Sequence, residues 1–186
     1  MYLFNALPWV VPLGLIGTAL GLGLLPVGRR SMPLSDRLLR ALLIGWAFVI
    51  IGAVIAPGPF YIPENTLRYC GLDEFPLPHF GLEFGHRMMN QILFAVPGVL
   101  AGGLSNSRWK WLTVGILALA PPVIEFTQWL LPLLARSCQL EDLSDNWFGL
   151  AVGLATGTVV RVLVAKWLLH RRLSASTQTT PRSVGQ

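Results

Sequence analysis

The stretch ALLIGWAFVIIGAVIAPGPFYIP, residues Ala41–Pro63, contains no Asp, Glu, Lys or Arg. The first stretch of the chain, Met1–Gly28, is also free of these side chains. A helix needs about 20 apolar residues to cross the hydrocarbon core of a bilayer, so both stretches are long enough. The same pattern along the chain predicts an all-α, polytopic transmembrane helix bundle. Its five predicted spans are residues 6–27, 41–62, 88–104, 111–133 and 146–165.

The composition excludes an ordinary soluble domain. Of the 186 residues, 53% are hydrophobic and only 12% are charged, whereas a soluble domain carries roughly a quarter charged residues. The formal net charge is +5, but the basic residues flank apolar segments and do not form a patch. They are therefore interpreted as topology signals, and nucleic acid is not expected as a partner. The N-terminus lacks the positive region of a signal peptide, so we expect the first helix to be retained.

The distribution of Lys and Arg predicts the orientation in the membrane, because cytoplasmic loops carry the excess of positive charge. One side of the predicted bundle holds ten of these residues: Arg29, Arg30, Arg37, Arg40, Arg108, Lys110, Lys166, Arg171, Arg172 and Arg182. The other side holds Arg68, Arg87 and Arg136. We therefore predict a multi-pass protein of the cell membrane with its N-terminus outside and its C-terminus in the cytoplasm.

The predicted organisation has three parts. Residues 1–85 supply two helices with a basic cytoplasmic loop and an outer loop. Residues 86–173 form a three-helix core. Residues 174–186 are rich in Ser, Thr and Gln and are expected to be a disordered cytoplasmic tail.

The two predicted outer segments, about 63–87 and 134–145, hold most of the acidic residues and both cysteines. Cys70 and Cys138 either form a disulfide, which the oxidising side of the membrane would favour, or remain two free thiols. His79 and His86 lie among carboxylates, but the sequence has no HExxH motif and no closely spaced cysteine pair. No metal site and no cofactor are therefore predicted.

Polar residues inside the predicted spans are the candidate functional residues. Glu125 is the charged residue of its span, where a charge costs roughly 2.5 kcal/mol or more at the centre. Gln128 shares its helix face. We expect Glu125 to lie close to Gln128 and to either Arg136 or Arg87, because an acid in apolar surroundings either finds a cation or becomes protonated. Asn90 lies on the same face as Pro97, and Pro97-Gly98 should free backbone carbonyls for partners. Alternatively, Glu125 reaches water near the outer interface and only fixes helix packing, and Asn90 only packs helices.

The last predicted loop and span carry a second group of polar residues. Arg136 precedes Asp142 and Asn146, which lie four residues apart at a helix entrance and share a face. Asp142 could instead simply cap the helix and match its dipole. Asp145, Gly149, Gly153 and Gly157 recur every four residues and form a stripe. Its glycines predict close approach of another helix, which we expect to be the third or the fourth.

Taken in order, these residues resemble a known pattern. Asn90, Pro97-Gly98, Glu125–x2–Gln128 and Arg136–x5–Asp142–x3–Asn146–x2–Gly149–x3–Gly153 are similar to the VanZ-like family of integral membrane proteins, over about residues 86–160. The resemblance implies a small multi-spanning protein with a link to glycopeptide antibiotic resistance, and it implies candidate residues without a reaction. This chain departs from the family pattern in Asp145-Asn146 and in the long loop before the third span.

The sequence leads to a functional hypothesis with two alternatives. We expect a non-enzymatic binder of a lipid-linked or amphiphilic envelope molecule, such as an envelope precursor or a lipoglycopeptide. The expected outward-facing pocket is formed by Asn90, Glu125, Gln128, Arg136, Asp142 and Asn146. One alternative is a membrane enzyme of envelope or lipid metabolism that uses Glu125 and Asp142 as acid and base. The other is a small transporter.

Overall fold

The computed structural model describes residues 2–24, 32–55, 70–71, 85–131 and 138–178. Within these ranges the chain is almost entirely helical, which confirms the predicted all-α class. The helices are α1 (Tyr2–Gly23), α2 (Leu34–Ile55), α3 (His86–Gly103), α4 (Arg108–Leu130) and α5 (Leu140–Gln178). Two short strands, β1 (Cys70–Gly71) and β2 (Cys138–Gln139), form a parallel pair. Each helix overlaps one predicted span.

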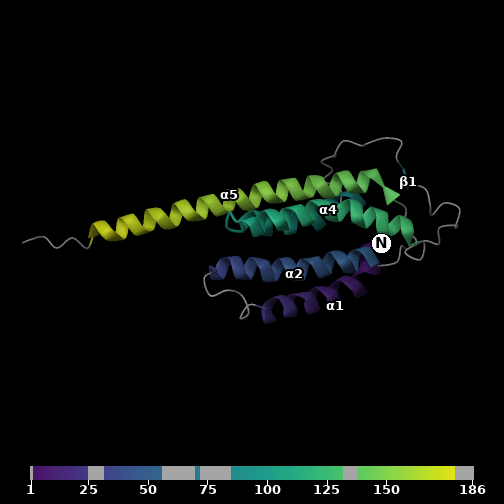
Figure 1. The fold of residues 1–186 in the computed structure, drawn as a ribbon, viewed down its shortest axis with the longest axis horizontal. Coiled ribbons are helices and arrows are strands. Elements are labelled where there is room, and N and C mark those ends of the chain that lie inside the picture. The colour runs from purple at the N-terminus through teal and green to yellow at the C-terminus, as the bar shows by residue number, and fades with distance from the viewer. Residues whose placement is uncertain (1, 25–31, 56–69, 72–84, 132–137, 179–186) are drawn as a thin grey trace, which may run out of the picture.

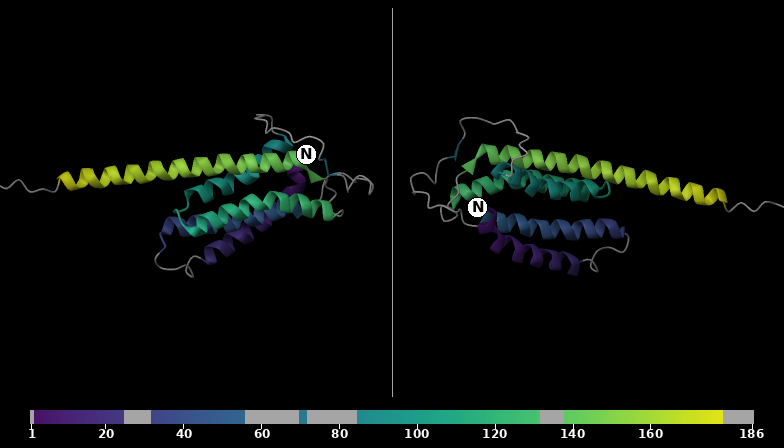
Figure 2. Two further views of the ribbon diagram at one scale, coloured as in Figure 1. Left: turned by 45° about the horizontal axis from the view of Figure 1, so that its top comes forward. Right: turned by 180° about the vertical axis from the view of Figure 1, so that it is seen from behind.

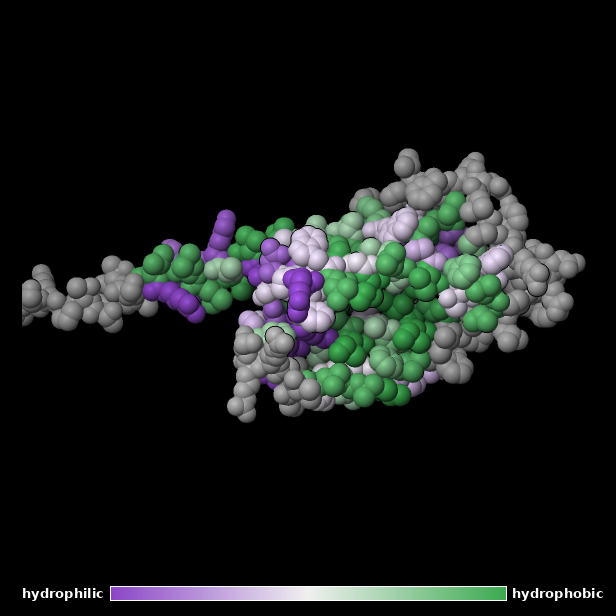
Figure 3. Space-filling model, viewed as in Figure 1, coloured by the Kyte–Doolittle hydropathy of each residue, from purple (hydrophilic) through white to green (hydrophobic). Residues whose placement is uncertain are grey.

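Three of the described helices have the length and composition of membrane-spanning segments. Leu34–Val54, Arg108–Leu130 and Leu140–Ser174 are each long and apolar enough to cross a membrane, and α1 contributes a shorter apolar stretch, Val10–Gly23. Large apolar side chains cover the flank of the bundle, whereas hydrophilic ones gather at the end from which α5 projects (Figure 3). Extended apolar surface of this kind is typical of contact with lipid or with another protein.

The helices form two pairs that lie against each other (Figures 1 and 2). α1 runs antiparallel to α2, because Gly14 lies against Val49 and Gly21 lies against Ala41. α3 runs parallel to α5, and α4 lies beside both. Parallel packing of α3 and α5 brings their N-terminal turns together at one end, which we call the β end because β1 and β2 lie there. The opposite end, where α2 and α4 begin, is called the basic end.

Glycines allow the close packing of α3 and α5. A Cβ atom on Gly149 would collide with the carbonyl of Gln91, and one on Gly153 would collide with that of Ala95. Gly98 is the reciprocal contact from α3, because its Cβ would lie 2.7 Å from a carbonyl of α5. Pro97 beside it is fully buried. The glycine stripe on α5 therefore meets the third helix, as the spacing predicts.

Two proline positions explain how neighbouring helices are linked. Pro97 has no N–H, so the carbonyl of Leu93 four residues earlier has no partner within α3. The indole N–H of Trp46 on α2 donates to that carbonyl at 2.8 Å. Pro122 frees the carbonyl of Ala118 in the same way, and an indole on α5, that of Trp147, donates to it at 2.8 Å. The predicted release of a backbone carbonyl in α3 is thus confirmed, and the indole N–H of a tryptophan supplies the missing donor.

α5 is much longer than its predicted span. It contains 39 residues, which corresponds to about 58 Å at 1.5 Å per residue. The helix therefore projects beyond the basic end (Figure 1). It includes Ser174–Gln178, the first part of the predicted tail. Residues 179–186 lie outside the described ranges.

Of the two alternatives for the cysteines, a disulfide or two free thiols, the structure contains the disulfide. Cys138 is disulfide-bonded, and the chain has only one other cysteine, Cys70. The two residues are also backbone partners in the β1–β2 pair. The backbone pairing holds β1, which lies between α2 and α3 in the sequence, beside β2, which leads directly into α5.

Candidate functional site

A buried ion pair joins α3 and α5 at the β end. Arg87 is in the first turn of α3, and Asp145 is in the second turn of α5 with no exposed surface. The guanidinium donates from Nε to Asp145 Oδ2 at 2.8 Å and from Nη2 to Oδ1 at 3.2 Å. Gln91 Nε2 donates to the same carboxylate at 3.0 Å, and Arg87 Nη1 lies 2.6 Å from Glu141 Oε1. Three donor atoms thus compensate a carboxylate that is removed from water.

Asp142 makes a second link between the same helices. Asn90 Nδ2 donates to Asp142 Oδ1 at 2.7 Å, and Nδ1 of His86 lies 3.3 Å from that oxygen. The proximity predicted for Asn90 and Asp142 is therefore found as a direct hydrogen bond. The His86 side chain is 46% exposed, so this contact lies at the open edge of the cluster.

Asn146 lies one helical turn after Asp142 and is 4% exposed. Its side-chain oxygen is buried, and no hydrogen-bond donor reaches it within the described part of the chain. Leaving a buried acceptor unsatisfied costs about 1–3 kcal/mol. This amide oxygen is thus a site at which a donor group of a ligand would be stabilising.

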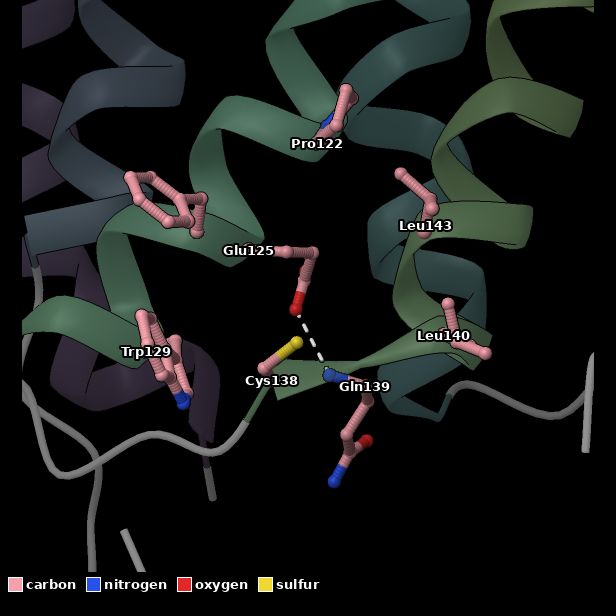
Figure 4. A pocket seen from close by; sticks show the side chains of 8 residues that line it. Pro122, Glu125, Trp129, Cys138, Gln139, Leu140 and Leu143 are labelled. Atoms are coloured by element: carbon pink, nitrogen blue, oxygen red, sulfur yellow. Dashed lines mark hydrogen bonds between the residues drawn. The ribbon is translucent and has the colours of Figure 1, made fainter. Parts of the chain in front are cut away.

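Glu125 lies on α4, and its hydrogen bond within the described residues is to the backbone of β2. It is 6% exposed, and its Oε2 accepts from the backbone N–H of Gln139 in β2 at 3.0 Å. Figure 4 shows the carboxylate pointing from α4 toward this strand. Arg87, one of the predicted cations, is bonded instead to acids of α5. The other predicted cation, Arg136, lies outside the described residues. Gln128, on the same face of α4, is also buried at 5% exposure.

A cavity of about 240 Å³ lies beside Glu125, between α4, β2 and the start of α5 (Figure 4). Its lining is mostly apolar or aromatic and consists of Pro122, Glu125, Phe126, Trp129, Cys138, Gln139, Leu140 and Leu143. The rings of Phe126 and Trp129 lie 5.8 Å apart. Phe126 is 57% exposed, so the aromatic wall adjoins the outer surface of the bundle. The cavity therefore presents one carboxylate within an apolar surface.

The cavity is small for a complete ligand. Pockets for drug-sized molecules have about 300–1,000 Å³. The space beside Glu125 therefore fits a head group or part of a chain, with the remainder of the molecule along the exposed aromatic wall.

The structure reveals site residues that the sequence reasoning missed. Gln91 and Glu141 were not among the predicted site residues. Arg87 was predicted only as a possible partner of Glu125, and Asp145 only as a member of the four-residue stripe that contains the glycines. A sequence signal existed, because Arg87 and Gln91 share one helix face at a four-residue spacing, as do Glu141 and Asp145. Phe126 and Trp129 were unremarkable in an apolar span. Within the described ranges, no group of three His, Cys, Asp or Glu could hold a metal ion.

Searches for related proteins found no matching family model, no matching curated protein and no matching solved structure. The chemistry of the site is therefore inferred from the geometry of this chain. That geometry defines a helical protein with several membrane-length apolar helices and a polar cluster at one end of them.

Proposed function

We propose that this chain is a multi-pass protein of the cell membrane in which all five helices span the bilayer, with the N-terminus outside and the C-terminus in the cytoplasm. The β end then faces outward. One observation supports five spans. Asp36 at the start of α2 accepts from the backbone N–H of Ser105 after α3, at 3.3 Å, so both segments lie at the basic end. α3 therefore has to traverse the bundle, and the positive-inside rule gives the direction.

The proposed activity is the binding of an amphiphilic or lipid-linked envelope molecule at the β end. The observation that carries this proposal is the cavity that places the buried Glu125 carboxylate within an apolar and aromatic lining. A head group with hydroxyl or ammonium donors would meet the carboxylate, and its apolar part would lie along Phe126 and Trp129. Ammonium groups also interact favourably with aromatic faces. The ion pair of Arg87 with the fully buried Asp145 supports the site by holding α3 against α5.

The resemblance to the VanZ-like family makes the same region the candidate site, and we propose a distant relationship to that family. Its link to glycopeptide resistance makes a lipoglycopeptide of the teicoplanin type a suitable probe. Such a molecule combines an acyl chain with amino and hydroxyl groups, which is the chemistry that the cavity favours.

Native mass spectrometry of the detergent-released protein tests this function. We expect the wild-type protein to retain an amphiphile and Glu125→Gln, which keeps the shape of the side chain, to lose it. A hydrogen bond to a charged group contributes about 1.5–3 kcal/mol, so the loss should be roughly tenfold or more in affinity. The same two proteins should differ in retention of the lipoglycopeptide probe.

Glu141→Gln is the matched control, because it removes a carboxylate at the same end that does not line the cavity. It should keep the amphiphile. Equal retention by Glu125→Gln and wild type would show that the carboxylate only serves packing. A cooperative thermal transition for each variant would establish that the comparison is made between folded proteins.

A further inference from the structure

A second cavity, of about 150 Å³, lies at the basic end between the end of α1 and the beginning of α2. Two arginines and several apolar residues line it: Gly21, Leu24, Met32, Arg37, Arg40, Ala41 and Ile44. Arg37 and Arg40 are three residues apart on α2 and therefore point to the same side. Arg40 also lies over the ring of Trp109, at 5.9 Å from its centroid. The cavity thus combines two cationic side chains with an apolar wall.

The surroundings of this cavity are strongly positive. Of the acidic residues that the structure describes, Asp36 lies at this end, and both of its carboxylate oxygens accept from the backbone of Ser105. Two other cations are directed elsewhere. Lys110 Nζ donates to the carbonyl of Gly102 at 3.0 Å, and Arg161 donates to that of Leu104. These contacts satisfy C-terminal carbonyls of α3, and Arg37 and Arg40 line the cavity.

We propose that this cavity binds the head group of an anionic glycerophospholipid. The phosphate would be held by Arg37 and Arg40, since guanidinium groups match phosphate oxygens in charge and geometry. Basic pockets between membrane helices commonly bind phospholipid head groups in this way. The site is at the opposite end from Glu125 and does not depend on the function proposed there.

The apolar part of the lining favours a lipid over free phosphate. An inorganic anion offers no apolar surface to Leu24, Ala41 and Ile44. The glycerol and the first carbons of an acyl chain would pack against these residues. Leu24 is 54% exposed, and its neighbours Leu20 and Leu42 are about half exposed, so an apolar path continues from the cavity along the flank of the bundle. A volume of 150 Å³ corresponds to about five water molecules. The head group therefore fills the cavity while the chains remain in the bilayer.

The test is native mass spectrometry of the full chain after reconstitution with phosphatidylglycerol or phosphatidylcholine. We expect the wild-type protein to retain phosphatidylglycerol preferentially. The double substitution R37Q/R40Q should weaken that retention at least tenfold. R171Q is the control, because it removes a guanidinium charge from a residue that lies over Trp167, near the C-terminal end of α5. It should bind phosphatidylglycerol like the wild type.

Three further outcomes decide the proposal. Equal retention of the two lipids by the wild-type protein would overturn it, as would unchanged retention by R37Q/R40Q. Displacement of the lipid by millimolar inorganic phosphate would identify a free-phosphate site instead and would also overturn it. If R37Q/R40Q does not fold, R37K/R40K replaces it: retention should fall partially, because lysine keeps the charge without the planar geometry. Full retention by the lysine variant would contradict a guanidinium-specific site.

Discussion

Asp145 is a charged residue with no exposed surface, and its neighbours show how the fold accommodates it. Removing a carboxylate from water is costly unless its partners are well placed. Here Arg87 binds both carboxylate oxygens, and Gln91 adds a further donor. Because Arg87 and Gln91 belong to α3, the charge of Asp145 fixes the register of α3 against α5. The same register brings Asn90 to Asp142 and so forms the polar cluster.

We expect Asp145→Asn to destabilise the protein by about 3 kcal/mol. Breaking a buried ion pair costs about 3–5 kcal/mol, and Arg87, whose side chain is 33% exposed, can recover part of this from water. Glu141→Gln should cost less than about 1 kcal/mol, because Glu141 is 40% exposed. Equilibrium unfolding in mixed micelles, followed by circular dichroism, provides both values. A variant Asp145→Asn as stable as the wild type would mean that the pair does not hold the helices together.

At the scale of the helices, prolines and tryptophans act together. A carbonyl freed by proline inside a membrane has no water to bond, so another part of the protein has to supply a donor. Trp46 supplies it from α2 to α3, and Trp147 supplies it from α5 to α4. The first of these bonds joins the α1–α2 pair to the rest of the bundle. The helices are thus connected at the positions where their own hydrogen bonding is incomplete.

This linkage predicts a coupling between Trp46 and Pro97. Trp46→Phe should destabilise the protein by about 1 kcal/mol, because it leaves the carbonyl of Leu93 unsatisfied. In a Pro97→Ala background the new backbone N–H at that position can bond the same carbonyl, so the Trp46 substitution should cost much less. A double-mutant cycle by thermal or denaturant unfolding measures the difference.

Trp111→Phe is the control for this cycle, because the Trp111 indole bonds an exposed side chain, that of Asn106. Its effect should stay below about 0.5 kcal/mol. If Trp46→Phe costs the same in the wild-type and in the Pro97→Ala background, the indole does not compensate for the missing N–H.

The sequence predicts the helices well because their signal is local. Charge-free runs such as Ala41–Pro63 mark the spans, and the glycine spacing from Gly149 onward predicts the contact face of α5. The ion pairs were harder to predict from the sequence. Arg87 and Asp145 are 58 residues apart, and several acids could have been the partner of Arg87. The spacing left the third and the fourth helix as partners of the glycine face of α5, and the structure shows that this face packs on α3. The predicted span ended at residue 165, before the basic residue Lys166, whereas α5 continues to Gln178.

At the scale of the whole molecule, the number of crossings determines where each end of the bundle lies. If all five helices cross the membrane, the beginning of α2 and the turn between α3 and α4 are on the same side. If only the three most apolar helices crossed, those two positions would be on opposite sides, because α2 alone would separate them. The bond from Ser105 to Asp36 favours the first arrangement. With five crossings the Glu125 cavity and the cavity of Arg37 and Arg40 lie on opposite sides of the membrane, and the proposed orientation puts the Glu125 cavity outside.

Cysteine labelling of intact cells tests this topology. We expect Met32→Cys and Asn106→Cys to resist a membrane-impermeant maleimide until the cells are permeabilised, because both positions should be cytoplasmic. His86→Cys, in the exposed part of the β end, should react in intact cells. Cys138 is already disulfide-bonded, so the native chain supplies a low background. Opposite behaviour of Met32→Cys and Asn106→Cys would exclude five crossings, and reaction of both in intact cells would reverse the orientation. A reversed orientation would move Glu125 to the cytoplasmic side and exclude an extracellular envelope ligand, whereas the packing of α3 on α5 would be unaffected.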